Sequence, residues 1–310
     1  MVTPTWVDLF GEGPVAVDGG LSTQLTRMGQ DVSGSLWTGR VLLHDPGAVT
    51  KAHAAFIAAG ADIVITASYQ VSRAGFRSAG LTEADADSAL VASVTAARAA
   101  TGASDRPVRL AASVGPYGAI LHDGSEYRGN YGLTHRQLVD FHRARIDVLL
   151  AQAPDLLAIE TIPDAREAEA LMQVLDDAGG PPSWVTFSAV DGGHVCAGQS
   201  IEECAAIVAG SSAVIATGVN CTDPAFVAEL LGRLAAATDL PLVAYPNAGG
   251  DWDPTSGEWH GDSLDDGTWE FSSAVLEEWR AAGAVAIGGC CGTDERTIRQ
   301  VSGWLARPGS

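Results

Sequence analysis

The chain has 310 residues, of which 46% are hydrophobic, and this is enough for one large core. Its formal net charge is −20, and no cluster of lysine or arginine is present to neutralise phosphates, so the sequence argues against a nucleic-acid partner. The acidic balance suits a cationic small substrate, although acidic surfaces are also common in soluble enzymes.

The apolar runs and the first residues predict neither a membrane protein nor a secreted one. No apolar stretch approaches the roughly 20 residues of a membrane span, and residues 1–5 lack the basic start and apolar run of a signal peptide. We therefore expect a soluble cytoplasmic protein whose five cysteines are reduced. In that compartment a cysteine cluster indicates a metal or catalytic site more often than a disulfide framework.

Strand-like apolar runs alternate with helices along the first half of the chain. In chain order the predicted elements are strand 14–17, helix 21–28, a helix capped at 44–46 and running to about 59, strand 61–66, helix 81–100, strand 109–114, a polar loop 121–132, helix 134–151 and strand 156–159. Thr82 and Asp85 predict a capping box at the start of helix 81–100. Gly60 should end the helix before it.

The same alternation continues to the end of the chain. The predicted elements are helix 162–175, strand 184–189, helix 201–209, strand 214–219, helix 224–237, strand 242–245, a loop 251–267 rich in Trp, Gly and Asp, helix 269–282, strand 284–287 and a last helix that ends near 306. Thr293 and Asp294 are the candidate caps of the last helix.

Eight strands alternating with helices, without a linker or a change in composition, predict an α/β fold. We expect a single-domain (β/α)₈ barrel over residues 1–310, and an open doubly wound sheet is the main competitor. The barrel has a consequence for function, because active sites of barrels lie at the carboxyl ends of the strands. The polar residues that stand after predicted strands are Asp18, Glu160, Cys221, Asn247, Cys290 and Cys291.

Three of these residues are cysteines, and they follow two different strands. Cys290 and Cys291 come after the last strand and Cys221 comes after the sixth, so three thiolates would form a metal site with a fourth position open for a substrate. The alternatives are ordinary core thiols or a disulfide between the adjacent cysteines. Cys204 falls within a predicted helix and Cys196 within a loop, and both are interpreted as structural.

The combination of these motifs resembles the homocysteine S-methyltransferase family from about residue 10 to residue 305. Asn220-Cys221 followed by the run from Gly288 to Gly292 is the most specific part, whereas each piece alone is weak. The other matching pieces are Asp18-Gly19-Gly20 with Gln24-Leu25 and Gly29, Leu36-Trp37, Thr66-Ala67-Ser68-Tyr69-Gln70, and Tyr245-Pro246-Asn247.

The resemblance implies a Zn²⁺-dependent barrel enzyme that methylates the thiol of homocysteine to give methionine. The chain looks like the short, single-domain branch that uses S-methylmethionine or S-adenosylmethionine as the methyl donor. The betaine-using relatives carry extra C-terminal dimerisation segments, which this chain lacks, so we expect a monomer. Its partners would be the two small-molecule substrates alone.

The resemblance also implies roles for individual residues. Cys221, Cys290 and Cys291 would hold zinc, and Asp18 and Glu160 would bind the substrate ammonium, which a fixed carboxylate can orient by charge-assisted hydrogen bonds. The substrate carboxylate would meet backbone N–H groups at Gly19-Gly20 and the following helix start. The other predicted substrate-site residues are Trp37, Ser68, Tyr69, Asn220 and Asn247.

Several of these roles stay open at the level of sequence. Trp37 and Tyr69 would hold a sulfonium by cation–π attraction or serve only as core packing, and Asn220 and Asn247 would be site residues or turn residues. The loop 251–267, with Trp252 and Trp259, would be a lid or an ordinary surface loop. The sequence also leaves open which methyl donor is used and whether the acceptor is a thiol or a selenol. A zinc hydrolase and a zinc or thiol sensor are alternatives; the sensor needs a fourth cysteine, Cys196 or Cys204.

Overall fold

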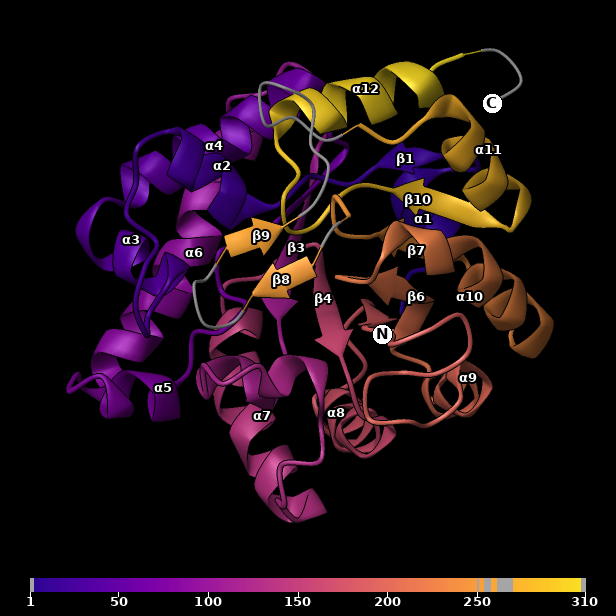
Figure 1. Cartoon of the computed structure of the whole chain (residues 1–310). Helices are drawn as coiled ribbons and strands as arrows, with labels where there is room; N and C mark the ends of the chain where they lie inside the picture. Colours follow the sequence, from indigo (N-terminus) through magenta and orange to yellow (C-terminus); the bar gives the residue numbers. More distant parts are fainter. Residues whose placement is uncertain (1–2, 250, 254–257, 261–269, 308–310) are drawn as a thin grey trace.

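Eight parallel strands form the centre of the computed structural model, which describes residues 3–249, 251–253, 258–260 and 270–307 (Figure 1). The strands pair in the order β1-β10-β7-β6-β5-β4-β3-β2, and a parallel bridge between Val17 and Ile63 joins β1 to β2. This bridge closes the sheet into a barrel. The bounds are β1 Val15–Ala16, β2 Ile63–Ile65, β3 Arg109–Val114, β4 Leu156–Ile162, β5 Ser183–Phe187, β6 Val214–Asn220, β7 Leu242–Tyr245 and β10 Ala284–Ile287.

The barrel confirms the predicted fold class and excludes the open doubly wound sheet. Each of the eight predicted strand runs overlaps one strand of the barrel. The strands are buried almost throughout, as expected when helices cover the outside of a parallel sheet and side chains fill the inside.

Helices surround the barrel on its outside, and most begin where the sequence predicts. Their bounds are α1 Trp6–Phe10, α2 Leu21–Arg27, α3 Thr38–His44, α4 Pro46–Ala59, α5 Arg73–Ser78, α6 Glu83–Gly102, α7 His135–Leu150, α8 Ala165–Asp177, α9 Ile201–Ala209, α10 Pro224–Ala237, α11 Ser273–Ala281 and α12 Glu295–Leu305. The predicted capping box of Thr82 and Asp85 begins α6, Gly60 ends α4 with φ 107°, and Asp294 caps α12. No helix in the described part of the chain is both long and apolar enough to cross a membrane.

Some local predictions were wrong or incomplete. The helix predicted from residue 269 begins at Ser273, because the Ser272 side chain accepts the backbone N–H of Val275 and caps the helix there. The short helices α1, α3 and α5 were not predicted, nor were the 3₁₀ turns η1 (Tyr117–Ile120) and η2 (Ser125–Tyr127). Within the expected loop 251–267, the strands β8 (Asp251–Asp253) and β9 (Glu258–His260) form an antiparallel pair. Residues 254–257 and 261–267 of that loop lie outside the described residues.

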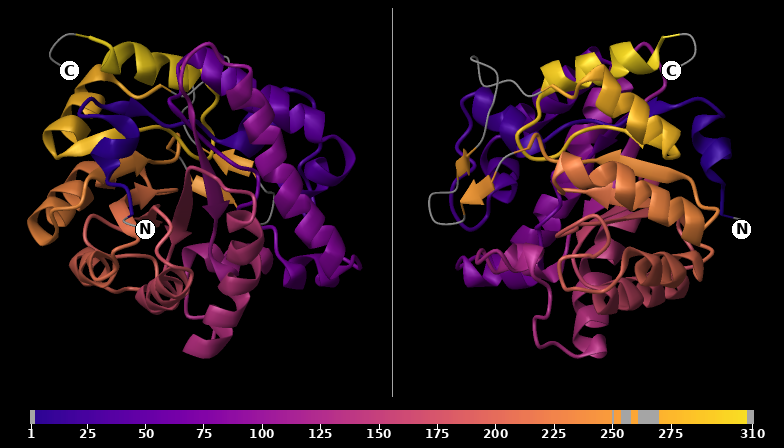
Figure 2. Two further views of the ribbon diagram at one scale, coloured as in Figure 1. Left: turned by 180° about the vertical axis from the view of Figure 1, so that it is seen from behind. Right: turned by 45° about the vertical axis from the view of Figure 1, so that its right-hand side comes forward.

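The barrel interior is filled from its amino end. Trp6 on α1 packs against Trp184 of β5 with ring centroids 6.5 Å apart, and Trp184 packs against Tyr245 of β7 at 6.2 Å. The Trp184 Nε1–H also donates to the Tyr245 hydroxyl at 3.1 Å. Figure 2 shows α1 and the β8–β9 pair at opposite ends of the barrel. The interior is therefore closed at the α1 end, and any site must lie at the other end.

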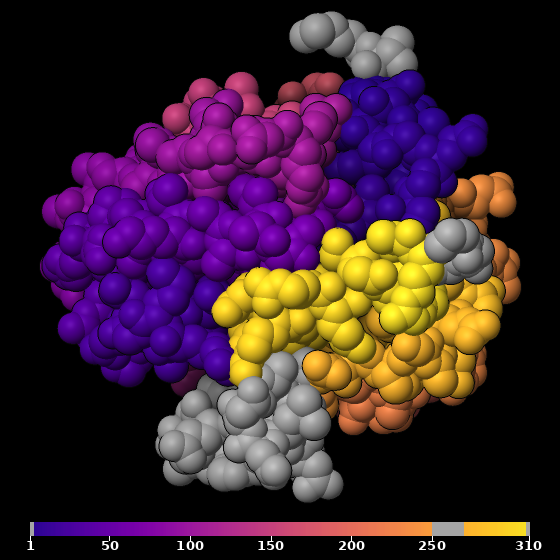
Figure 3. All heavy atoms as spheres, turned by 90° about the horizontal axis from the view of Figure 1, so that it is seen from above, coloured from indigo at the N-terminus to yellow at the C-terminus, as the bar shows by residue number. Residues whose placement is uncertain are grey.

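The last helix of the chain packs against elements from its N-terminal part. The last helix, α12, contacts α4 and β1, and Figure 3 shows it (yellow) beside the N-terminal part of the chain. Ile298 of α12 shares a small buried cluster with Phe56 and Ala59 of α4. The helix α12 therefore packs beside the place where the first and last strands of the barrel, β1 and β10, pair.

Candidate active site

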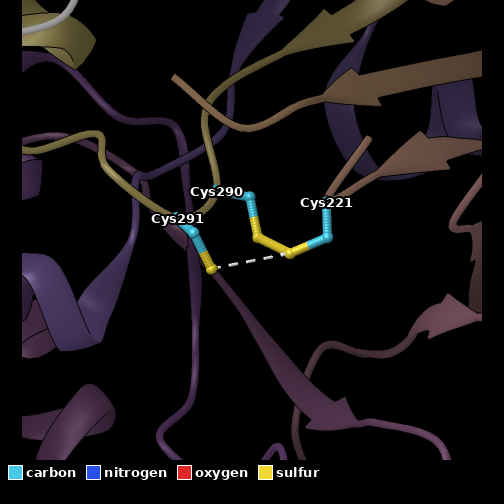
Figure 4. Close-up of side chains that lie close together, drawn as sticks. All are labelled: Cys221, Cys290 and Cys291. Atoms are coloured by element: carbon cyan, nitrogen blue, oxygen red, sulfur yellow. Dashed lines mark hydrogen bonds between the residues drawn. A yellow bond between two sulfur atoms is a disulfide. The ribbon is translucent and has the colours of Figure 1, made fainter. Parts of the chain in front are cut away.

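Three cysteines meet at the carboxyl ends of β6 and β10, as the sequence predicted (Figure 4). The sulfur atoms of Cys221, Cys290 and Cys291 all lie within 4.8 Å of one another. Cys221 and Cys290 are joined by a disulfide, and the Cys291 Sγ lies 3.8 Å from the Cys221 Sγ. The expectation that all five cysteines are reduced was therefore wrong for this structure. The Cα atoms of Cys221 and Cys290 are 5.6 Å apart, a separation that permits a disulfide between two strand ends.

Glycines make the close approach of these strand ends possible. A side chain at Gly288 would meet the Val17 Cβ at 2.7 Å, and one at Gly20 would collide with the Cys290 carbonyl oxygen. The Cys290 N–H donates to the Pro246 carbonyl oxygen at 2.7 Å, which anchors the cysteine loop to the end of β7. These glycines are thus needed because they let neighbouring backbone segments approach closely, and not only because they allow the chain to turn.

The three thiols fit a soft tetrahedral metal ion. A metal–sulfur bond of about 2.3 Å gives a tetrahedral edge of about 3.8 Å, and this matches the distance from Cys221 to Cys291. Burial raises the pKa of the Cys291 thiol to about 12, although a hydrogen bond from Tyr127 lowers it. A bound cation is therefore needed for this thiol to ionise at neutral pH. Among the described residues the cluster holds no fourth cysteine, because Cys204 is buried in the helical core and Cys196 contacts Ser188.

Two carboxylates stand beside the cysteines, at the ends of β1 and β4. Asp18 is 2% exposed and accepts the Ile65 N–H at 2.8 Å, while Glu160 is 7% exposed and accepts the Ser113 hydroxyl. Burial raises the pKa of Glu160 to about 7, against hydrogen bonds from Ser113 and Tyr245 that lower it. Burial, together with the charge of Glu160, also raises the pKa of Asp18 well above its usual value. Both groups would be stabilised as carboxylates by a cationic ligand.

One cavity unites most of the predicted residues. Nine of the twelve line it, namely Asp18, Gly19, Gly20, Trp37, Tyr69, Glu160, Cys221, Cys290 and Cys291. Among the described residues its lining holds three carboxylates and no lysine, arginine or histidine. The cavity therefore favours ligands that carry positive charge.

The other three predicted residues lie behind the cavity wall. Ser68 is fully buried and donates to the Ser113 carbonyl oxygen at 2.7 Å. Asn220 is also fully buried, and its side-chain amide bonds the end of β4. Asn247 is 6% exposed, and its Oδ1 is buried without a hydrogen-bond partner in the described part of the chain. Their placement favours a role in supporting the wall over direct contact with substrate.

The backbone is strained beside two site residues, at a register shift within β4 and directly after β6. Thr161, which follows Glu160, has φ 61°, and Cys221 has φ 46°. A positive φ is uncommon outside glycine, and for a β-branched residue such as threonine it requires support from its surroundings. Asn220 gives that support, because its Oδ1 accepts the Thr161 N–H at 2.6 Å and its Nδ2 donates to the Thr161 Oγ1 at 2.7 Å.

Aromatic and acidic side chains form the remaining walls. The rings of Trp37 and Tyr69 meet edge to face with centroids 6.3 Å apart. Glu126 and Tyr127, on η2, also line the cavity. The sequence predicts this segment only as a polar loop. Its position after the third predicted strand was the signal available, because every such loop of a barrel lies on the face that holds the site.

Three clustered cysteine sulfurs and two buried carboxylates at the carboxyl end of a barrel indicate a barrel enzyme whose site could hold a metal ion. The homocysteine S-methyltransferase family model matches residues 15–305. The chain is 41% identical over 311 residues to homocysteine S-methyltransferase 2 of Zea mays, which covers 96% of this chain and 91% of the relative. This chain belongs to the homocysteine S-methyltransferase family, as the sequence motifs predicted.

Further relatives extend the similarity. Selenocysteine Se-methyltransferase of Brassica oleracea var. italica is 40% identical over 306 residues, which cover 93% of this chain and 88% of the relative. The homocysteine methyltransferase MmuM of Escherichia coli has a metallated form that matches with a TM-score of 0.84 and 36% identity, covering 94% of this chain and 96% of that chain. Its oxidised form matches with a TM-score of 0.85 and 35% identity, covering 96% and 98%.

Proposed function

We propose that this enzyme moves a methyl group from a sulfonium donor, S-methylmethionine or S-adenosylmethionine, to the thiol of L-homocysteine and so forms methionine. The observation that carries the proposal is one cavity in which three thiols face two buried carboxylates. The thiols suit a metal that binds the substrate sulfur, and the carboxylates suit the ammonium of an amino acid. Residues 1–310 would act as one homocysteine-binding domain.

We propose Zn²⁺ as the metal, held by Cys221, Cys290 and Cys291. When bound, zinc would supply a soft Lewis acid that keeps a substrate thiol ionised at neutral pH. The Cys221–Cys290 disulfide has to be reduced before these residues can act as ligands. A zinc hydrolase is disfavoured, because three thiolates leave the metal a poor Lewis acid for water.

The chain's own residues then orient the acceptor. Asp18 and Glu160 bind the ammonium by charge-assisted hydrogen bonds. The Gly20 N–H is already engaged, since it donates to the Thr293 Oγ1 at 3.1 Å. The substrate carboxylate would therefore bind the N–H of Gly19 and the first turn of α2, whose N–H groups have no partner within the helix.

The methyl donor requires positioning by the protein rather than acid or base catalysis. Its sulfonium leaves as a neutral thioether, so no general acid is required. The acceptor sulfur, the methyl carbon and the leaving sulfur have to lie in line, and the protein holds them so. Trp37 and Tyr69 present aromatic faces and edges that suit a sulfonium. The relative named as a selenocysteine Se-methyltransferase supports a selenol as an alternative acceptor.

Methionine formation tests the proposal. Reduced, zinc-loaded protein receives homocysteine with S-methylmethionine, and methionine is counted against a control without enzyme; parallel reactions contain S-adenosylmethionine or betaine. Turnover with a sulfonium donor is the expected result. Turnover with betaine alone would refute the donor assignment, and the same activity after zinc is removed by a chelator would refute the metal.

Other features of the proposed enzyme stay predictions. These are its monomeric state, its cytoplasmic location, the absence of a nucleic-acid partner, and a lid role for residues 251–267. Light scattering coupled to size-exclusion chromatography checks the first.

A further inference from the structure

The proposed acceptor site assigns no role to the wall formed by η2. Glu126 and Tyr127 line the cavity from this turn, which follows β3. The turn is fixed in place, because Asp123 accepts the Ser125 N–H at 2.9 Å and the Gly129 N–H donates to the Ser125 carbonyl oxygen at 2.9 Å. Glu126 is thus presented to the cavity by a well-supported segment.

One oxygen of the Glu126 carboxylate lacks a hydrogen-bond partner among the described residues. Its Oε2 is buried without a hydrogen bond in the described part of the chain. Arg128, the nearby cation on this loop, is 60% exposed and pairs with Asp123. Burial raises the pKa of Glu126, although its own backbone N–H and the charge of Arg128 partly stabilise the carboxylate, and the described cavity lining holds no basic side chain. A cationic ligand would offset the cost of burying this carboxylate.

The position of Glu126 indicates which cation that ligand carries. Glu126 stands on η2 beside Tyr127, and both residues line the cavity that also holds the aromatic wall and the cysteine cluster. Asp18 and Glu160 are hydrogen-bonded to a different part of the wall, at β2 and β3. Because Asp18 and Glu160 are already assigned to the acceptor ammonium, Glu126 is the lining carboxylate that remains for the cation of the methyl donor.

We infer that Glu126 is a donor-binding residue that holds the positively charged sulfur of the methyl donor opposite the thiol cluster. The inference rests on the proposed function, since it needs a sulfonium donor. In the transfer, the acceptor sulfur forms a bond to the methyl carbon while the bond from that carbon to the sulfonium sulfur breaks. The electron pair of the broken bond returns to the leaving sulfur, which becomes a neutral thioether. The attraction to Glu126 weakens along this path, so Glu126 strengthens donor binding without accelerating the chemical step.

The test compares S-methylmethionine with 2-amino-5-methylhexanoic acid, its uncharged carbon isostere. Calorimetry with reduced, zinc-loaded protein, without homocysteine so that no turnover occurs, gives both Kd values for the wild type and for Glu126→Gln. The wild type should prefer the sulfonium, and Glu126→Gln should reduce that preference about tenfold or more. Asp123→Asn is the matched control, because it removes a charge from the same loop and keeps an acceptor for Ser125; its preference should equal that of the wild type.

Each other outcome overturns the inference. Equal weakening of both ligands in Glu126→Gln would mean that Glu126 binds the ammonium, and an unchanged preference would mean that it does not bind the donor. A wild type that binds neither ligand, or binds both alike, would refute the proposed donor class together with this inference. In turnover, the donor KM of Glu126→Gln should rise about tenfold while kcat stays within about threefold, and a fall in kcat alone would contradict donor binding.

Discussion

Glu160→Gln separates the functional role of the buried carboxylate from its effect on stability. Glu160 lies at the end of β4 with only 7% of its surface exposed. Glutamine has nearly the same shape and can still accept the Ser113 hydroxyl on its Oε1. The substitution therefore removes the charge and leaves the packing of the cavity wall in place.

The first expected effect is weaker acceptor binding. A hydrogen bond between a carboxylate and an ammonium contributes about 1.5–3 kcal/mol, which corresponds to a rise in the homocysteine KM of roughly 10- to 150-fold. Initial rates at saturating donor, with homocysteine varied, measure this change. An unchanged homocysteine KM would remove Glu160 from the acceptor site.

The second expected effect is on the free energy of unfolding, and its sign follows from the pKa. Burial raises the pKa of Glu160 from 4.5 to about 7, so between these pH values the folded chain keeps a proton that the unfolded chain has lost. The contribution of Glu160 to stability is therefore present at low pH, decreases as the pH rises through this window, and is constant above it. Since one pKa unit corresponds to about 1.4 kcal/mol, the loss is on the order of 3 kcal/mol.

Urea denaturation of the reduced, metal-free protein at pH 5 and pH 8 tests this sign. The free energy of unfolding of Glu160→Gln, relative to that of the wild type, should be higher at pH 8 than at pH 5. If this difference between variant and wild type is the same at both pH values, the reasoning is refuted. Ser113→Ala is the control, because it keeps the carboxylate but removes a hydrogen bond that lowers its pKa. In Ser113→Ala the pH dependence of the homocysteine KM should shift to higher pH.

Three further substitutions, two of them with a matched control variant, test the cysteine cluster and its support. Cys290→Ser should abolish turnover and release zinc, measured by elemental analysis, while its circular dichroism spectrum stays unchanged. The control Cys204→Ser should keep zinc and activity. Zinc loss from Cys204→Ser would instead support a non-enzymatic zinc sensor. Gly20→Ala should lower zinc affinity and destabilise the fold by about 1–3 kcal/mol, because the added Cβ collides with the Cys290 carbonyl oxygen. The control Gly232→Ala on α10 has open space around its Cβ, so it should neither change the zinc affinity nor lower the stability. Asn220→Ala should cost about 2–4 kcal/mol in urea denaturation and raise the homocysteine KM, and wild-type values would exclude a supporting role.

The barrel and the thiol cluster could be predicted because both depend on regular features of the sequence. Buried strands of a parallel sheet are apolar runs, and residues that follow such strands converge on one face. This places Cys221 and Cys290 together without knowledge of any contact. The start of α11 and the η2 turn could not be predicted in the same way. They depend on a single serine cap and on tertiary packing, and neither leaves a periodic pattern.

The least predictable part of the site is the geometry that makes Glu160 and Cys221 face one cavity. The backbone adopts a left-handed conformation at Thr161, which follows Glu160 within β4, and at Cys221 itself, directly after β6. Such conformations are costly for these residue types and persist only where the surroundings compensate. The side chain of Asn220 supplies that compensation, because it bonds Thr161 while its own backbone leads directly into Cys221. Asn220 thus couples Cys221 of the cysteine cluster to the part of β4 that carries Glu160, the proposed ammonium-binding carboxylate, and its sequence position next to Cys221 does not reveal this role.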